Sequence, residues 1–405
     1  MKRIGLFLIG ILLLLTSCAP TPKEEIVQNP DETTEQEISI VPSYQLSNDN
    51  YKMLLPFRPS QARGVVVNQL RNRLDIEEME DGLRRHSTEA FDPEKYYYEE
   101  GQYLTENTVY DWLGRFPTEE QLERRVNNEI ARRKNNGLNY NEDSIRASFQ
   151  QGLNPPLEEE GATEEDYRKS PRYLSHILEQ NFLERKDDVV ELVGVSLGIA
   201  IKSEYSFVAE DKGPYYETIS DKEMLKQGKD IAQKILERVR KIEGLENIPI
   251  MLALYQEETE ASPVPGNFVA KTLVSAGDMM IGEWENIDEE YVLFPSDQAK
   301  SDYFDDYEMV KSFGQGIAEY FPNYVGYIGE GFYINEELRK LSIEVPIEFY
   351  GAAEVVGFTQ YAYGLVKNIF PNRYDIEVKI SSTDKLESFI YREAGEEDPN
   401  VHILH

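Results

Sequence analysis

Residues 193–201 read VGVSLGIAI and carry the clearest fold signal in the chain. Large apolar residues stand at every second position, which is the period of a strand whose side chains alternate between two faces. The positions between them hold only glycine, serine and alanine. Side chains this small let a helix approach the backbone closely. We therefore predict a buried strand with a helix packed on its small-residue face.

Further elements follow this strand. Ser220 and Glu223 resemble a capping box, and the apolar stripe that they open ends at Gly244. Apolar alternation then predicts two more strands. In the first unit we predict a helix over 170–182, a strand over 193–201, a strand-to-helix loop over 203–219, a helix over 220–243 and strands over 250–254 and 268–274.

The same order of elements is predicted again near the C-terminus. The predicted elements are a helix over 307–320, a strand over 341–349, a helix over 355–369 and strands over 374–380 and 386–391. We therefore predict two similar α-β-α-β-β units, over 170–275 and 303–405, with a connection over 276–302. Two such units could share one sheet or pack as two layers.

The region before these units, residues 51–169, is predicted to be mainly helical. Thr118 and Gln121 form a second capping-box pattern, ahead of apolar residues at four-residue spacing. Helices are also predicted over 60–74 and 77–90. Helical and strand-rich regions in succession give an α+β fold class.

The first seventeen residues have the parts of a bacterial lipoprotein signal peptide. Lys2 and Arg3 precede an apolar run over 4–15, which is shorter than the roughly 20 residues that span a bilayer. The lipobox pattern follows as Leu15-Thr16-Ser17-Cys18. We expect a diacylglyceryl transferase to lipidate the Cys18 thiol with palmitate-type chains, and signal peptidase to cleave between Ser17 and Cys18. The product would be lipid-anchored at the outer face of the cell membrane.

Composition limits the partners of the exported part. The formal net charge is −33, which argues against nucleic acid because phosphates bind through Lys and Arg. Residues 18–50 are polar and nearly free of aromatics, so we predict a disordered tether there. Cys18 is the single cysteine, so no internal disulfide can form.

Catalytic or cofactor-binding residues are not predicted. The four histidines lack metal-ligand spacing, no Gly-x-Ser-x-Gly elbow occurs, and no glycine run has phosphate-loop spacing. Asp187-Asp188 and Asp305-Asp306 are interpreted as solvated acidic pairs. The 26 tyrosines, among them Tyr96, Tyr97 and Tyr98, are common at binding surfaces. A cell-wall-associated hydrolase with paired carboxylates and a tyrosine-rich adhesion protein remain as alternatives to a non-catalytic binding module.

Short stretches that invite comparison with a known family run in order from residue 50 to the C-terminus. They are Asn50-Tyr51-Lys52, Leu54-Leu55-Pro56-Phe57, Ser60-Gln61-Ala62-Arg63-Gly64, Glu80-Asp81-Gly82-Leu83, Gly152-Leu153-Asn154-Pro155, residues 170–180, Gln227-Gly228-Lys229, Ile248-Pro249-Ile250, Pro295-Ser296, residues 350–354 and Val401-His402-Ile403. In these stretches the chain resembles the CamS family, the sex pheromone precursor lipoproteins of Gram-positive bacteria.

The resemblance implies a second product. In this family the pheromone is a short apolar peptide cut from the end of the signal peptide, just before the lipid-bearing cysteine. Here that peptide is Ile11-Leu12-Leu13-Leu14-Leu15-Thr16-Ser17. The family assigns no established catalytic residues to the folded part. We therefore expect a lipid-anchored surface protein with a candidate secreted pheromone in segment 11–17 and a mature part that binds a ligand the sequence does not identify.

Overall fold

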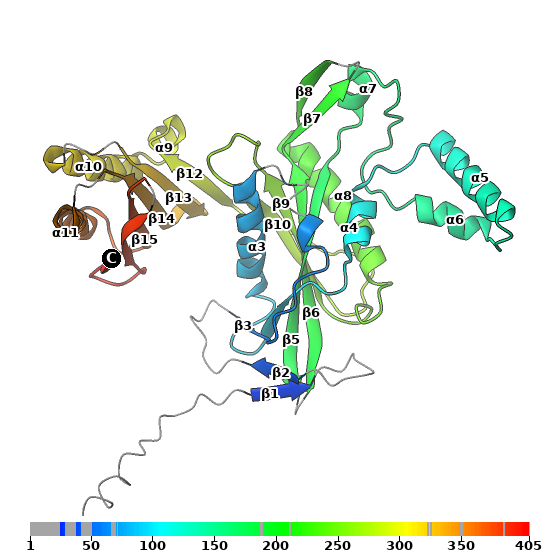
Figure 1. Cartoon of the computed structure of the whole chain (residues 1–405), viewed down its shortest axis with the longest axis horizontal. Coiled ribbons are helices and arrows are strands. Elements are labelled where there is room, and N and C mark those ends of the chain that lie inside the picture. Colours follow the sequence, from blue (N-terminus) through cyan, green and yellow to red (C-terminus); the bar gives the residue numbers. More distant parts are fainter. Residues whose placement is uncertain are drawn as a thin grey trace, which may run out of the picture.

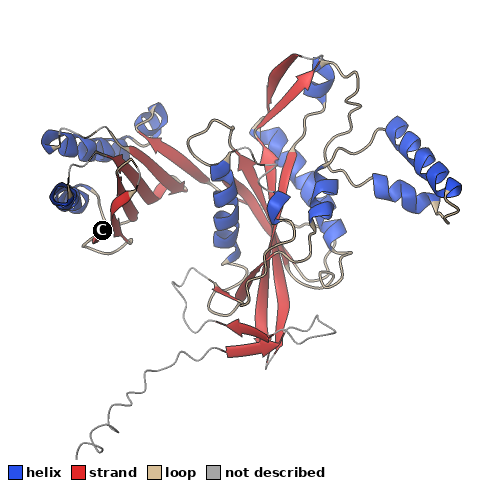
Figure 2. Ribbon diagram, in the orientation of Figure 1, coloured by secondary structure: helices blue, strands red, loops and turns tan. Residues whose placement is uncertain are grey.

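The computed structural model has an α+β fold, which confirms the predicted class (Figures 1 and 2). The structure describes residues 51–65, 70, 72–186, 189–209, 212–321, 324, 326–348, 351–383 and 385–404. Before these it describes the backbone of two short strands, β1 (Glu25–Gln28) and β2 (Ile38–Val41), which pair with each other. The signal segment and Cys18 lie outside the described residues, so the signal peptide remains a prediction. The strands β1 and β2 lie inside the stretch predicted to be a disordered tether, so that prediction does not hold for their residues.

A mixed sheet forms the centre of the molecule (Figure 1). Its middle strands β6 and β9 are parallel and are joined by α8 (Asp221–Val239), whereas the flanking strands β5 and β10 run antiparallel to them. The strands, in spatial order, are β11 (Glu285–Asn286), β10 (Asn267–Val274), β9 (Ile250–Glu257), β6 (Val189–Lys202), β5 (Leu174–Lys186), β4 (Tyr97–Glu100) and β3 (Lys52–Met53).

The small-residue face of β6 is covered by α3 (Arg73–Ser87), as the alternating pattern predicts. A Cβ on Gly198 would lie 3.2 Å from both Leu83 and Met79 of that helix. The Ser87 hydroxyl donates to the Ser196 hydroxyl at 2.8 Å. The large residues of β6 belong to the core on the opposite face, which includes α8. Close approach on one face and large side chains on the other explain why β6 tolerates glycine inside a strand.

A second mixed sheet follows in the chain and is covered on one face by α10 (Phe304–Tyr320) and α11 (Ala352–Ile369) (Figure 2). Its middle strands β14 and β15 are parallel, and α11 connects them. The short helix α9 (Asp297–Asp302) follows the first strand. In spatial order the strands are β12 (Glu289–Phe294), β13 (Ile328–Ile334), β14 (Glu337–Pro346), β15 (Asp375–Ser381), β16 (Leu386–Arg392) and β17 (Asn400–Ile403).

The two units share one topology, but its element order differs from the predicted one. Each consists of an antiparallel pair, a crossover helix and a second antiparallel pair: β5-β6-α8-β9-β10 and β13-β14-α11-β15-β16. The helix predicted over 170–182 is wrong, because β5 occupies most of this stretch. Both faces of β5 are buried, so apolar residues such as Ile177 and Leu178 stand side by side and hide the alternation.

Three other local points also differ from the sequence analysis. Strand β13 was missed because Gly329 and Gly331 interrupt its apolar pattern; a Cβ on Gly331 would lie 2.9 Å from Phe294 and Tyr333. The predicted loop over 203–219 is a hairpin of β7 (Glu204–Ala209) and β8 (Lys212–Thr218). The helix predicted through residue 74 is wrong at its end, because Asn72 caps the start of α3.

Helices dominate residues 101–169, with α4 (Glu106–Leu113), α5 (Glu119–Asn135), α6 (Glu142–Phe149) and α7 (Glu164–Lys169). The capping box of Thr118 and Gln121 is confirmed. Helices α5 and α6 project from the body as an arm with a small core of their own (Figure 1). Within the described part of the chain, the helices are too short or too polar to cross a bilayer.

A polar cluster links α3 to the second sheet. The Arg85 guanidinium donates to Glu78 at 2.8 Å and to Glu289 of β12 at 3.1 Å. His86 Nε2 lies 3.1 Å from the Glu289 carboxylate, and the Arg85 guanidinium lies 4.5 Å from the ring centre of Phe332 in β13. Helix α3 therefore covers the first sheet and also contacts the second unit.

Candidate functional site

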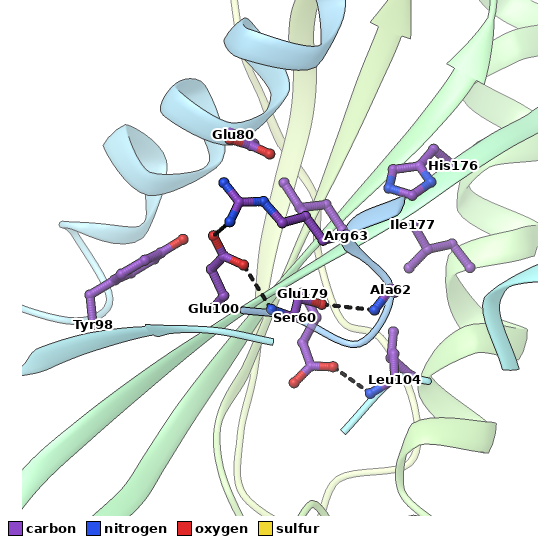
Figure 3. Close-up of a pocket in the computed structure, with 11 residues that line it drawn as sticks. Ser60, Ala62, Arg63, Glu80, Tyr98, Glu100, Leu104, His176, Ile177 and Glu179 are labelled. Atoms are coloured by element: carbon purple, nitrogen blue, oxygen red, sulfur yellow. Dashed lines mark hydrogen bonds and ion pairs between the residues drawn. The ribbon is translucent and has the colours of Figure 1, made fainter. Parts of the chain in front are cut away.

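A cavity lies beside β5, at the point where β4 ends and leaves the sheet edge (Figure 3). The last pair of this ladder is Glu100 with Gln180, and the Gly101 N–H then donates to the Glu179 carbonyl at 3.1 Å. The Ser60 N–H donates to the Glu100 carboxylate at 2.7 Å and holds the segment 60–63 over the strand edge. The residues that line the cavity are Ser60, Ala62, Arg63, Glu80, Tyr98, Glu100, Leu104, His176, Ile177, Leu178 and Glu179.

The cavity is narrow and open to solvent. The centre of a water-sized sphere can occupy about 30 Å³ of it, and all the space between its atoms, with the solvent at the mouth, is about 480 Å³. An ordered water needs on the order of 10–15 Å³ of the first kind of space, so a small polar group fits inside. A longer ligand would extend through the mouth.

Glu179 fixes the turn that borders the cavity. Its carboxylate accepts hydrogen bonds from the backbone N–H groups of Gln102 at 3.0 Å, Tyr103 at 3.1 Å and Leu104 at 2.6 Å. Burial raises the pKa of this carboxyl group, and the three N–H groups oppose that rise. A Cβ on Gly101 would lie 2.5 Å from the Glu179 Cβ, so only glycine fits there. Glu179 therefore has a structural role.

His176 carries the least satisfied polar group of the cavity wall. The residue is 2% exposed, and burial lowers the pKa of its imidazole to about 3, so the ring is neutral near pH 7. Nδ1 is buried without a hydrogen-bond partner. A buried polar atom left unpaired costs on the order of 1–3 kcal/mol, which is unusual enough in a folded protein to require an explanation.

Two carboxylates form the acidic side of the cavity. Burial and the nearby Glu100 carboxylate raise the pKa of Glu80. One Glu100 oxygen accepts from Ser60, and the other lies 3.6 Å from the Arg63 guanidinium, whose side chain is 57% exposed. On the other side the apolar groups of Leu104, Ile177 and Leu178 face the space. This arrangement suits binding of a small polar group that carries an apolar chain.

The residues predicted to act in processing are not among those that the structure describes. Residues 11–18 lie outside the described part of the chain, as does the pair Asp187-Asp188. In the other predicted acidic pair Asp306 is buried and accepts from the Tyr333 hydroxyl at 3.0 Å, so it is not simply solvated. Of the tyrosine cluster, Tyr98 lines the cavity.

The sequence analysis missed the cavity residues, although one signal was present. Five polar residues of β5 are buried, which is uncommon in a strand covered on both faces: Ser175, His176, Glu179, Gln180 and Asn181. Because the stretch was predicted to be a helix, its polar residues could be assigned to a solvent-facing side. They therefore did not indicate a buried site. The remaining lining residues come from segments that only the fold brings together.

Residues 57–398 match the model of the family described as CamS sex pheromone cAM373 precursor. Among curated proteins, none matches this chain. A sex pheromone precursor from Lactobacillus salivarius subsp. salivarius UCC118 is similar in structure, with a TM-score of 0.77, 24% identity, and coverage of 91% of this chain and 99% of that one. The C-terminal domain of the sex pheromone staph-cAM373 precursor from Staphylococcus aureus has a TM-score of 0.67, 29% identity, and coverage of 83% and 98%.

Proposed function

Because this chain belongs to the CamS family of sex pheromone precursors, we propose that it is exported and lipid-anchored at Cys18. In this proposal the segment 11–17 is released as a candidate pheromone. The mature part is then a non-catalytic binding module at the outer face of the membrane. The observation that carries the proposal is the lipobox Leu15-Thr16-Ser17-Cys18, at the end of a signal-type segment and ahead of a family match that begins at residue 57.

The anchor follows from the chemistry of the lipobox. A thioether-linked diacylglyceryl group at Cys18 brings two acyl chains, which hold a protein firmly where one chain gives only marginal binding. The cysteine is the only one in the sequence, so no other thiol competes for the lipid. The acidic body repels anionic lipid headgroups, and the segment 18–50 separates the two.

The binding role of the folded part is supported by the cavity beside β5. Within the described residues His176 is not oriented by a carboxylate, and the Ser60 hydroxyl accepts from the Ala62 N–H at 3.1 Å instead of bonding to a base. A nucleophile activated by a neighbouring base needs such contacts. The neutral imidazole of His176 and the carboxyl groups of Glu80 and Glu100 are hydrogen-bonding groups that suit a ligand.

The Cys18→Ala variant tests the anchor. Metabolic labelling with a palmitate analogue should mark the wild-type protein and not the variant, which should also keep its signal peptide. Ser17→Ala is the matched control, since it keeps a small residue before the cysteine and should be labelled and cleaved normally. Labelling of Cys18→Ala at the wild-type level would refute the anchor.

Release of the candidate pheromone requires a separate measurement. Mass spectrometry of the culture medium should detect the heptapeptide Ile11-Leu12-Leu13-Leu14-Leu15-Thr16-Ser17 from cells that make the wild-type protein. The peptide should be lost in cells that make Cys18→Ala, because cleavage depends on lipidation. If the cleaved wild-type protein accumulates and only other fragments are found, the segment 11–17 is not the released product.

A further inference from the structure

We propose that a second cavity, where β6 and β9 end, binds a hydroxylated ring of the kind found in sugars. Strand β6 ends at Lys202 and β7 begins at Glu204, so the hairpin of β7 and β8 leaves the sheet there (Figure 1). The cavity is lined by Lys202, Glu204, Ser206, Tyr216, Glu257 and the loop 258–261. This inference rests on the proposed role of the folded part as a binding module and names the chemistry of a ligand.

The ion pair of Lys202 and Glu257 puts a donor and an acceptor side by side in this cavity. The two residues are partners in the parallel ladder of β6 and β9, and the Lys202 ammonium donates to Glu257 Oε2 at 3.2 Å. Glu257 is 6% exposed, and its Oε1 is buried without a hydrogen-bond partner. An unpaired buried oxygen is unusual in a folded protein and indicates that a further donor belongs there.

The missing donor is best supplied by an uncharged group. The Lys202 ammonium already brings a positive charge next to Glu257, so a second cation at the same place would be repelled by it. An anion would be repelled by the carboxylates of Glu204 and Glu257. A hydroxyl group both donates and accepts. It can therefore donate to Glu257 and accept from one of the other N–H groups of the Lys202 ammonium.

The hairpin gives the cavity a wall that suits a ring. Glu204 and Ser206 lie on one face of β7 because they are two positions apart, and Ser206 is the ladder partner of Tyr216 on β8. Cross-strand partners have Cβ atoms about 4.5–5.5 Å apart, so these side chains lie together. Tyr216 is 51% exposed and offers a flat apolar surface. The C–H face of a ring can pack on it, while Glu204 and Ser206 bond to the hydroxyls at the ring edge.

The loop 258–261 completes the lining and is held in place by α3. The side-chain amide of Asn72, the residue that caps α3, donates to the carbonyls of Thr259 at 3.4 Å and of Ser262 at 3.2 Å. The centre of a water-sized sphere can occupy about 370 Å³ of the cavity, whereas one ordered water needs on the order of 10–15 Å³. The cavity is therefore preformed and has room for a ring, as ligand sites usually are.

Saturation-transfer difference NMR of the full-length chain tests this inference. Dodecylphosphocholine micelles keep the lipid-anchored chain in solution and contain no sugar. The probes are the methyl glycosides of glucose, galactose and N-acetylglucosamine at about 10 mM, since a Kd near 1 mM is expected for ligands of this size. At least one probe should give a saturation-transfer signal. Cyclohexanol has a ring with a single hydroxyl, and n-butylammonium has a charge without a ring, so neither should displace the bound glycoside.

Variants locate the bound ring. Tyr216→Ala should weaken glycoside binding about two- to tenfold, because the stacking surface is lost. Tyr320→Ala is the matched control, since Tyr320 is 60% exposed in the second unit and does not line the cavity. Glu257→Gln should weaken binding at least about tenfold, because a hydrogen bond to a charged acceptor is lost. If Glu257→Gln fails to fold because Lys202 loses its partner, the comparison of the two tyrosine variants still decides.

Three results would overturn the inference: no signal from any of the glycosides at about 10 mM, displacement by cyclohexanol or n-butylammonium at that concentration, or equal affinity in the two tyrosine variants. Binding that Tyr216→Ala leaves unchanged would place the ligand elsewhere and leave the binding-module proposal standing. Lipidation of Cys18 does not enter this readout, so failure here also leaves the anchor and pheromone proposals standing.

Free sugars and glycan chains both carry such a ring, and cellotetraose, a short glucose chain, distinguishes these sources. Tighter binding of cellotetraose than of the methyl glucoside supports a glycan chain, because further rings then contact the protein beyond the cavity. Equal or weaker binding supports a single sugar.

Discussion

The Glu179→Gln substitution should destabilise the first unit by breaking the turn beside the cavity. One carboxylate oxygen of Glu179 accepts from Gln102 and Tyr103, and the other accepts from Tyr103 and Leu104. Glutamine replaces one of these oxygens with an NH₂ donor. Either orientation of the amide therefore leaves at least one buried backbone N–H without its acceptor.

The expected cost follows from these contacts. Losing one hydrogen bond to a charged acceptor costs about 1.5–3 kcal/mol, and removing a buried charge offsets part of this loss. We expect the free energy of unfolding to fall by about 2 kcal/mol for Glu179→Gln, and by about 3–5 kcal/mol for Glu179→Ala, which leaves all three N–H groups unpaired.

Urea denaturation followed by tryptophan fluorescence measures this effect, because Trp112 and Trp284 both pack with the core of the first unit. For a urea slope of about 2 kcal/mol/M, the midpoint of Glu179→Gln should fall by about 1 M. The control Glu184→Gln lies on the same strand, where the half-buried Glu184 forms an ion pair with the exposed Lys95 at 3.4 Å, and should cost less than about 1 kcal/mol. Equal midpoints for the two variants would refute the structural role of Glu179.

Gly194→Ala should destabilise the first unit by about 1–3 kcal/mol in urea denaturation, since the new Cβ would overlap the Phe91 ring. The control Gly357→Ala, on an exposed face of α11, should be neutral or stabilising. Similar free energies of unfolding for the two variants would contradict the packing argument. Thr118→Ala should cost about 1 kcal/mol and speed amide hydrogen exchange in the arm of α5 and α6, with the central sheet unchanged. Because of His176, the free energy of unfolding should fall by about 1.4 kcal/mol for each pH unit below pH 6.5. In that range the unfolded chain takes up a proton on the imidazole, and the folded chain does not do so until about pH 3. The His176→Gln variant should lose this pH dependence. An unchanged slope of stability against pH in the variant would contradict its assignment to His176.

The elements that could be predicted are those whose signal lies within a few consecutive residues. Strand β6 has one large-residue face and one small-residue face, so its alternation is visible. The capping box at Thr118 needs only the residues up to Gln121. By contrast, β5 is buried on both faces and β13 contains two glycines for close packing, so neither shows the period of a strand.

The cavity could not be predicted because its wall is assembled from separate parts of the chain. The covering segment 60–63, the helix residue Glu80, the end of β4 at Glu100 and the β5 residues from His176 meet only when the first sheet forms. Residues 60–63, Glu80 and His176 stand in stretches that resemble the CamS family, but no stretch alone indicates a cavity. Their proximity depends on strand pairing over long sequence separations, which composition and periodicity do not encode.

The sequence by itself determined the lipobox prediction at Cys18 and the alternating strand over 193–201, because each depends on neighbouring residues and not on tertiary contacts. Only the tertiary structure decided the chemical state of the cavity residues. His176 is held neutral because the surrounding sheet and helices exclude water from it, and the Glu179 carboxylate is held by the turn that leaves β4. Desolvation and hydrogen bonding are set by groups distant in sequence, and these interactions fix which side chains remain available to a ligand.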